Sequence, residues 1–192
     1  SPLPPVTLPS GPVREVVHRG ADVDLHRLPA IRYTEKQSRP YLSAACVVAR
    51  DGESGAFNLS FNRLMLDDRN TLAIYMTPES DLDQIFQRNR RAGRDTPVAA
   101  FIGSHPLWSL GSLASGPLSL DEYSVIGGLL GRPLAVVPGL LDDSLRIPAG
   151  AEMALEGSLS CKETLDEGPY GEAFGYVSPI GKRPLFRVEL MS

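Results

Sequence analysis

Short runs that are apolar at every second position, or at nearly every position, dominate the chain after its first dozen residues. Such runs, separated by Gly and Pro, are typical of β-strands. Strands are predicted at residues 42–50, 56–65, 71–77, 97–104, 133–138, 151–159, 172–177 and 184–191. Many short strands with this punctuation predict a mainly β domain, either a barrel or a sandwich.

One segment after the third predicted strand has helical spacing instead. Ser80 is a candidate N-cap and Gly93 a candidate stop signal. Between them, three apolar residues recur at helical spacing and are expected to face the core, namely Leu82, Ile85 and Phe86.

A second helix is predicted after residue 118. Ser119 and Glu122 have the spacing of a capping box, which gives Glu122 a local explanation as the partner of the cap. Leu118 and Tyr123 are spaced for a hydrophobic staple. The expected buried stripe consists of Val125, Ile126, Leu129 and Leu130.

Length and composition fit one domain, since the chain has 192 residues of which 42% are apolar. Residues 1–14 are rich in proline and are expected to form a linker or arm, which leaves residues 15–192 as the domain. The formal net charge of −4 supplies no basic field, so nucleic acid is not an expected partner.

Cysteine usage and hydropathy indicate a cytoplasmic protein without a membrane span. Cys46 and Cys161 form no CxxC pair, which fits a reducing compartment. No run reaches the roughly 18 apolar residues of a spanning helix. The first residues also lack the charged and apolar regions of a signal peptide.

A loop near the C-terminus carries two candidate acid/base residues. Glu167 and Glu172 stand at either end of a Gly-Pro-Tyr-Gly sequence that is too broken to be helical. Such a loop can direct both carboxylates into one pocket, where a nearby arginine keeps one ionised while the other carries a proton. The alternative is a polar surface turn.

Residues 57–63 alternate strictly between apolar and polar side chains. Asn58, Ser60 and Asn62 are expected on one face of a strand, with Phe57, Leu59 and Phe61 packed on the other, and the polar row could line a ligand site. Arg63 is out of phase with Asn58, so both reach one ligand only if the strand bulges or ends near Asn62. The alternative is an amphipathic strand with a solvated face.

Taken in order from about Glu15 to the C-terminus, these segments resemble the UbiD family of prenylated-FMN-dependent decarboxylases. The matching pieces are residues 22–25 with Leu28-Pro29, residues 58–63, residues 121–123 with Gly127, residues 148–157, and residues 167–172 with Gly175-Tyr176. The resemblance implies a mainly β (α+β) fold, a split β-barrel of the FMN-binding, flavin-reductase-like type with two or more helices.

The resemblance also implies roles for individual residues. Arg63, Glu167 and Glu172 would form a network beside the flavin, in which Glu172 donates the proton that replaces carbon dioxide and the other two support it electrostatically. Asn58 and Glu122 match metal ligands that hold the cofactor phosphate, a task suited to hard oxygen donors. The other implied cofactor contacts are Ser60, Phe61, Asn62 and Arg63 in the strand, and Ala114, Ser115 and Pro117 in a loop.

The cofactors implied by the resemblance are prenylated FMN, a divalent metal (manganese or magnesium) and potassium. The implied reaction is the non-oxidative decarboxylation of an unsaturated or aromatic carboxylic acid through an adduct with the prenylated flavin, where the cofactor carries the difficult chemistry. The implied partners are the carboxylic acid, the remaining domains of a longer parent chain and the enzyme that supplies the prenylated flavin. A homo-oligomer is compatible with this pattern.

Two features depart from the family pattern. The family's metal-binding histidine, expected just after Pro78, is absent, and the chain reads Glu79-Ser80-Asp81 there. Either Glu79 or Asp81 substitutes for it, or Ser80 and Asp81 only begin a helix and metal affinity is weakened. Family members are also more than twice as long, with a C-terminal domain that supplies a phosphate-binding lysine, much of the substrate pocket and the main oligomer contacts.

These departures leave two alternatives to a decarboxylase domain. The first is a non-catalytic module that binds flavin or forms part of an assembly, which the missing histidine and the length favour. The second is a flavin reductase built on the same barrel, although such an enzyme has no use for a paired-carboxylate loop. The joint presence of Arg63, Glu167 and Glu172 favours the decarboxylase.

Overall fold

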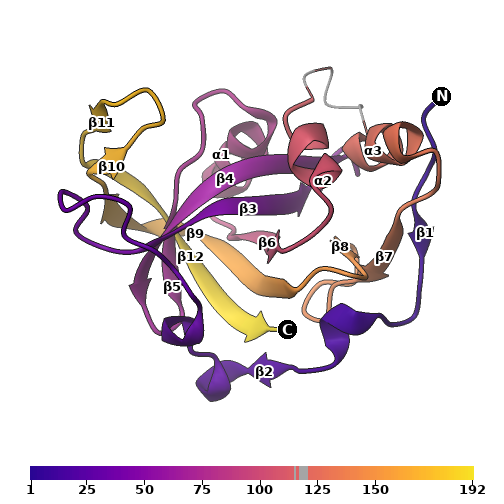
Figure 1. Ribbon diagram of the computed structural model, residues 1–192, viewed down its shortest axis with the longest axis horizontal. Helices are drawn as coiled ribbons and strands as arrows, with labels where there is room; N and C mark the ends of the chain where they lie inside the picture. The colour runs from indigo at the N-terminus through magenta and orange to yellow at the C-terminus, as the bar shows by residue number, and fades with distance from the viewer. Residues whose placement is uncertain (115, 117–120) are drawn as a thin grey trace.

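Six antiparallel strands close into a barrel at the centre of the molecule (Figure 1). The computed structural model describes residues 1–114, 116 and 121–192. The strands follow the order β12-β5-β4-β3-β6-β9, and the pairing of β9 with β12 closes the ring. Their bounds are Tyr41–Arg50 for β3, Phe57–Asp68 for β4, Thr71–Ile74 for β5, Thr96–Ile102 for β6, Met153–Glu167 for β9 and Gly181–Met191 for β12. The predicted mainly β split barrel is confirmed.

The barrel interior is filled by alternate residues of its strands. On β3, Val47 and Ala49 point into this interior core, because successive side chains of a strand point to opposite faces. Helix α1 (Asp81–Arg91) contributes to the same core with its buried residues, which are Leu82, Ile85 and Phe86 as predicted. The Ser80 hydroxyl caps this helix by accepting from the Asp83 amide at 3.4 Å, also as predicted.

A second core covers the outer face of the same barrel wall. Cys46 and Val48 of β3 point outward into it, where they meet Trp108 and Tyr123. The elements that cover this face are α2 (Leu107–Gly111), α3 (Glu122–Leu130), β7 (Ala135–Pro138) and β8 (Arg146–Pro148). In Figure 1 the two helices lie together at the upper right, beside the strand β7.

The N-terminal residues run along the outside of this second layer (Figure 1). Strand β1 (Val6–Thr7) pairs in parallel with β7. Arg14 then donates to the fully buried Glu156 at 2.7 Å and so attaches the segment to the barrel. The short elements that follow are 3₁₀ helices at Pro12–Arg14, Gly20–Asp22 and Leu25–Arg27 and the strand β2 (His18–Arg19), which pairs with β12.

The start of α3 differs from the predicted capping box. Asp121 is the N-cap, and its side chain accepts from the Tyr123 amide at 3.2 Å. Ser119 and Leu118, which were expected to cap and staple this helix, lie outside the described residues. The buried stripe was also wrong in part, since Leu129 is 62% exposed, whereas Tyr123 and Ile126 lie in the outer core.

Two predicted strands need correction, and two short elements were missed. Residues 172–177 do not form a strand: they lie mostly in the turn between the short strands β10 (Tyr170–Gly171) and β11 (Val177–Ser178). Strand β9 runs to Glu167, beyond the predicted end at residue 159, because its polar second half pairs with β12 as an exposed ribbon. The strand β8 and the helix α2 were not predicted, since both are too short to have a periodic pattern.

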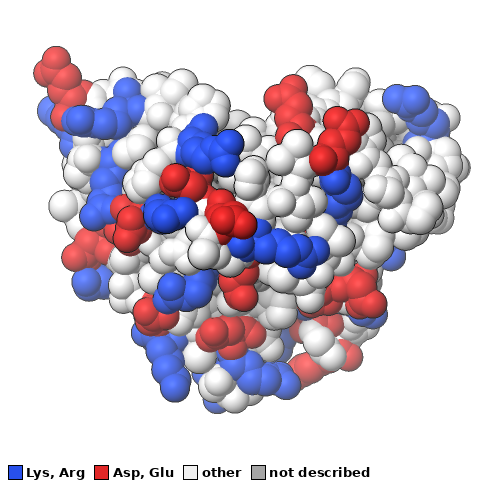
Figure 2. Space-filling model, turned by 90° about the horizontal axis from the view of Figure 1, so that it is seen from below, with Lys and Arg blue, Asp and Glu red and all other residues white. Residues whose placement is uncertain are grey.

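Charged side chains of both signs are mixed on the surface. Figure 2 shows one face, on which Lys and Arg lie among Asp and Glu, and neither sign forms a broad area. Exposed ion pairs such as Arg187–Glu163, at 2.8 Å, have the same mixed character and contribute little stability. Within the described residues, no helix is long and apolar enough to cross a membrane.

Candidate functional site

A pocket of about 390 Å³ lies against the first half of β4, between the start of α1 and the helices α2 and α3. Most of the predicted cofactor and metal residues line it, namely Asn58, Ser60, Phe61, Asn62, Ala114, Glu122 and Asp81. Leu59, Thr77, Ser80, Ser112, Leu113 and Gly116 complete the lining. Ser115 and Pro117, which were also predicted as cofactor contacts, lie outside the described residues.

The polar residues of β4 form a chain of hydrogen bonds along the pocket wall. Asn58 Nδ2 donates to Ser60 Oγ at 3.4 Å, and Ser60 Oγ donates to Asn62 Oδ1 at 2.7 Å. Asn62 Nδ2 donates in turn to the Tyr75 carbonyl at 3.0 Å. Among the described residues, no hydrogen bond reaches Asn58 Oδ1, so this oxygen remains available to a ligand.

The predicted assignment of side chains to the two faces of β4 was wrong for Phe61. Its ring was expected to pack on the apolar face with Leu59, but it is 37% exposed and lines the pocket. The core behind β4 ends before this position, so the phenyl ring is left at the pocket, where it can contact a planar ligand.

Glu122 has a buried carboxylate that the surrounding protein does not satisfy. Its residue is 5% exposed, and Oε2 has no hydrogen-bond partner within the described part of the chain. Burial raises the pKa of Glu122 to about 7, opposed by the backbone amides of Glu122 and Leu59 and supported by the nearby charges of Asp121 and Asp81. A buried carboxylate oxygen of this kind needs a proton or a cation.

The two candidate substitutes for the missing histidine occupy different positions. Asp81 lines the pocket together with Asn58 and Glu122, whereas Glu79 is not part of the lining. Glu79 has a left-handed backbone with φ 65°, and its amide donates to Asp83 Oδ2 at 3.0 Å. Across the described ranges, no group of three or more His, Cys, Asp or Glu side chains is arranged as a metal site. The pocket therefore offers two carboxylates and one amide oxygen.

Arg63 joins the two glutamates of the C-terminal loop in one ionic cluster. Its Nε and Nη2 donate to the two oxygens of Glu167 at 3.0 and 3.2 Å. Its Nη1 donates to Glu172 Oε1 at 2.7 Å. The Glu167 side chain is fully buried, the Arg63 side chain is 10% exposed and the Glu172 side chain is 26% exposed. Glu172 is thus the member of the cluster that a substrate or solvent reaches most easily.

Three residues that were not predicted from the sequence support this cluster. Tyr41 donates its hydroxyl to Glu167 Oε1 at 3.1 Å. Arg183 Nε lies 3.6 Å from Glu167 Oε2, the oxygen that also accepts from Arg63 Nη2. The Tyr75 ring lies under both guanidinium groups, at 4.1 Å from that of Arg63 and 4.6 Å from that of Arg183. No local motif could have identified these residues, because they come from separate strands.

The charges of the cluster shift the pKa values of its members. Burial opposes the charge of Arg63, but the hydrogen bonds and charges of Glu167 and Glu172 raise its pKa overall. The Ser178 hydroxyl and Arg63 lower the pKa of Glu172, although partial burial opposes them. Burial and the Glu167 carboxylate raise the pKa of Tyr41. Glu172 is therefore a stronger acid than an isolated glutamic acid.

The pocket and the cluster are neighbours on β4, but they are distinct groups of side chains. Asn62 belongs to the pocket and the next residue, Arg63, to the cluster. The β3–β4 ladder has an irregularity at this point, with the extra residue on β3 between Leu42 and Ala45, while β4 continues to Asp68. Arg63 is not part of the pocket lining, and it faces the glutamates instead.

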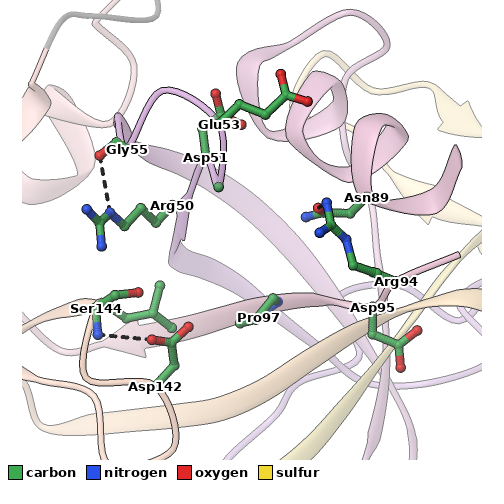
Figure 3. A pocket seen from close by; sticks show the side chains of 12 residues that line it. Arg50, Asp51, Glu53, Gly55, Asn89, Arg94, Asp95, Pro97, Asp142 and Ser144 are labelled. Carbon is green, nitrogen blue, oxygen red and sulfur yellow. Dashed lines mark hydrogen bonds between the residues drawn. The ribbon is translucent and has the colours of Figure 1, made fainter. Parts of the chain in front are cut away.

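A separate cavity of about 550 Å³ contains none of the predicted site residues (Figure 3). It lies between the turn after β3, the end of α1 and the turn around Asp142. Figure 3 shows Arg50 and Arg94 on opposite sides, with the acids Asp51 and Asp142 between them, above and below. Because the charges of this lining alternate in sign, the cavity does not select an anion or a cation, and we assign it no function.

Comparison with known proteins identifies the family. Residues 6–192 match the UbiD domain described as the 3-octaprenyl-4-hydroxybenzoate carboxy-lyase Rift-related domain. A pyrrole-2-carboxylic acid decarboxylase from Pseudomonas aeruginosa is 38% identical over 195 residues, which covers 100% of this chain and 39% of that protein. An uncharacterized protein from Aquifex aeolicus is 35% identical over 187 residues, which covers 96% of this chain and 38% of that protein.

Solved structures give the same result. The UbiD-class enzyme HmfF from Pelotomaculum thermopropionicum, in an evolved dimeric form in complex with prFMN, matches with a TM-score of 0.95 and 34% identity over 100% of this chain and 45% of that one. Vanillic acid decarboxylase from Sedimentibacter hydroxybenzoicus matches with a TM-score of 0.95 and 28% identity over 100% of this chain and 42% of that one. The chain spans about two fifths of the length of the curated relatives it matches. The chain therefore belongs to the UbiD family.

Proposed function

We propose that this chain is the prenylated-FMN-binding domain of an enzyme that non-oxidatively decarboxylates an unsaturated or aromatic carboxylic acid. The observation that carries the proposal is the ionic cluster in which Arg63 holds a fully buried Glu167 and a partly exposed Glu172. The names of two relatives, a pyrrole-2-carboxylic acid decarboxylase and a vanillic acid decarboxylase, support an aromatic acid as substrate.

In the proposed reaction Glu172 is the proton donor. Removal of carbon dioxide leaves a carbon that must gain a proton, and Glu172 is the most exposed carboxyl group of the cluster. The lowered pKa of Glu172 makes its protonated form a stronger donor, since the carboxylate that results is held by Ser178 and Arg63, and it also reduces the fraction of Glu172 that carries a proton at neutral pH. Glu167 is a positioning residue, because its two hydrogen bonds fix the Arg63 guanidinium.

The lining of the pocket fits the phosphate end of a flavin cofactor held through a divalent cation. Asn58, Asp81 and Glu122 offer hard oxygen donors, and the unsatisfied Glu122 Oε2 is the observation that favours a cation there. Manganese or magnesium suits such a set, and we assign no residue to potassium. The chemistry that prenylated FMN would supply when bound is an acceptor for the electron pair of the bond that breaks when the carboxyl group departs.

The alternative is a flavin-binding or assembly module without decarboxylase activity. It is favoured by the absence of a histidine after Pro78, since Asp81 is the only substitute that lines the pocket. A module of this kind would keep the pocket but would have no use for the proton-donating cluster.

A binding titration tests the proposed cofactor site. The chain is titrated with prenylated FMN and manganese, followed by absorbance after dialysis, and compared with its Asn58→Ala and Glu122→Ala variants. Loss of a metal ligand should weaken retention about 10- to 100-fold. Glu53→Ala, an exposed acid that lines the separate cavity, is the control and should bind normally. A wild-type chain that retains no flavin in the presence of manganese would contradict the proposed site.

Activity of the full-length parent separates the decarboxylase from the module. Glu172→Gln should retain the flavin but lower carbon dioxide release by about 100-fold, since an amide cannot donate the proton. Normal flavin content with no activity in the wild-type parent, over a range of aromatic and unsaturated acids, would favour the module instead.

A further inference from the structure

The hairpin that carries Glu172 is anchored by apolar packing only at its start, where the Tyr170 ring lies 4.8 Å from that of Tyr41. Phe174 is 88% exposed and Tyr176 is 61% exposed, so the tip of the hairpin contributes little to the core. The strands β10 and β11 make only two residue pairs, Tyr170 with Ser178 and Gly171 with Val177. Beyond Tyr170, the position of the Glu172 carboxylate depends on its polar contacts with Arg63 and Ser178.

Those contacts distinguish the two oxygens of the carboxylate. Arg63 Nη1 donates to Glu172 Oε1 at 2.7 Å, and the Ser178 hydroxyl, from the facing strand, donates to the same oxygen. Among the described residues, Glu172 Oε2 receives no hydrogen bond. One oxygen thus has two donors, and the other is open.

We infer that Ser178 is a positioning residue that, with Arg63, holds Glu172 Oε1 as the acceptor oxygen, so that Oε2 is the oxygen that carries and delivers the proton. The inference rests on the proposed function, because it refines the role of Glu172 in that reaction. Ser178 acts through Glu172 and not on the substrate itself.

The proposed step is balanced in atoms and electrons. The Oε2–H bond of Glu172 breaks, and its electron pair remains on Oε2. The proton forms a C–H bond with the electron pair left on the substrate carbon when carbon dioxide departs. In the neutral acid, Oε1 is the carbonyl oxygen and still accepts from both donors, so Arg63 and Ser178 need not move during the transfer. Glu172 is 26% exposed, which allows water to return a proton to Oε2.

The hydroxyl also affects the acidity of Glu172. The Ser178 hydroxyl lowers the pKa of Glu172, and Arg63 lowers it further through a hydrogen bond and its charge, because both stabilise the ionised form. The other titratable and charged groups around the cluster are Glu167 of β9, Tyr170 of β10, Tyr41 of β3 and Arg183 of β12. Since Glu172 must be protonated to act, activity should fall as the pH rises through its pKa.

Two variants of equal shape test the inference in the full-length parent loaded with prenylated FMN. Ser178→Thr keeps a hydroxyl, whereas Ser178→Val removes it. At low pH, where Glu172 is protonated in every variant, the Val variant should lower kcat about tenfold, since the carboxylate formed by the transfer loses a hydrogen-bond donor. The raised pKa of Glu172 should also move the fall in activity to higher pH. In the Thr variant, kcat and the pH at which activity falls should both lie close to their wild-type values.

A second readout does not depend on the loaded enzyme. Titration of the Glu172 carboxyl carbon by NMR in flavin-free protein, assigned with Glu172→Gln, should give a higher midpoint for Ser178→Val than for Ser178→Thr. Equal midpoints and equal pH profiles in the two variants would overturn the role of Ser178. Full activity in Glu172→Gln would overturn the proposed donor itself, so the two failures are distinguishable.

Discussion

The Glu122 carboxyl makes the stability of the flavin-free chain dependent on pH. Its pKa is raised from the ordinary value of 4.5 to about 7 by burial, so the folded state holds the proton more tightly than the unfolded state. The stabilisation that results is fully present below the unfolded pKa and is lost as the pH rises through the folded pKa. Glu122→Gln, which stays neutral, should therefore exceed the wild type in free energy of unfolding by about 3 kcal/mol at pH 8 and match it near pH 4.

Urea denaturation at the two pH values measures this difference. Glu163→Gln, which changes an exposed glutamate, should give no gain at pH 8. Manganese should reduce the difference in free energy of unfolding between Glu122→Gln and the wild type, because it stabilises the wild type. An ion that binds only the folded state raises the free energy of unfolding. A Glu122→Gln variant that is less stable than the wild type at pH 8 would contradict this account of the pocket.

For individual residues, the sequence predicted which side chains line the pocket better than it predicted which side chains surround the cluster of Arg63, Glu167 and Glu172. Asn58, Ser60 and Asn62 could be grouped because they alternate along one strand. Tyr41 and Arg183 could not, because their contacts with Glu167 come from separate strands and, for Tyr41, span 126 residues of sequence. Local spacing contains no information about which side chains a closed barrel brings together.

At the scale of elements, the barrel closes through an approach of β9 and β12 that only glycine allows. Gly157 pairs with Val188 of β12, and a Cβ atom at Gly157 would overlap the carbonyl oxygen of Arg187. Gly157→Ala should therefore lower the free energy of unfolding by about 3 kcal/mol, measured by urea denaturation, since the overlap is with backbone that cannot rotate away.

Gly150→Ala is the matched control for this substitution. Gly150 lies in the turn before β9, and nothing lies within 4 Å of a Cβ atom at this position. Its substitution should change the free energy of unfolding by no more than about 0.5 kcal/mol. Equal effects of the two substitutions would mean that β9 and β12 are less close than the structure shows.

The same strand explains where element prediction succeeded and where it failed. The first half of β9 is apolar and was predicted, but its second half is polar and is held by pairing with β12, which no local pattern reveals. Residues 172–177 contain the aromatic and β-branched residues of a strand, yet they form a hairpin turn with an exposed Phe174. Strand propensity predicts suitability for a pleated surface, and here no partner strand is present.

For the whole molecule, the two cores share one wall. Strand β6 contributes Val98 and Ala100 to the interior core and Ala99 and Phe101 to the outer core, and β3 and β9 also contribute to both. A strand that detaches from one core must also detach from the other. The chain should therefore unfold as a single cooperative unit, although its side chains form two separate clusters.

Leu159→Ala tests this coupling. Leu159 is fully buried in the interior core, so the substitution should lower the free energy of unfolding by about 3 kcal/mol. The single tryptophan, Trp108, lies in the outer core and reports on that core by fluorescence. Urea unfolding followed by Trp108 fluorescence and by far-UV circular dichroism should shift to the same lower midpoint in the variant. A fluorescence midpoint that stays at its wild-type value, while the circular dichroism midpoint falls, would mean that the outer core folds independently of the barrel interior.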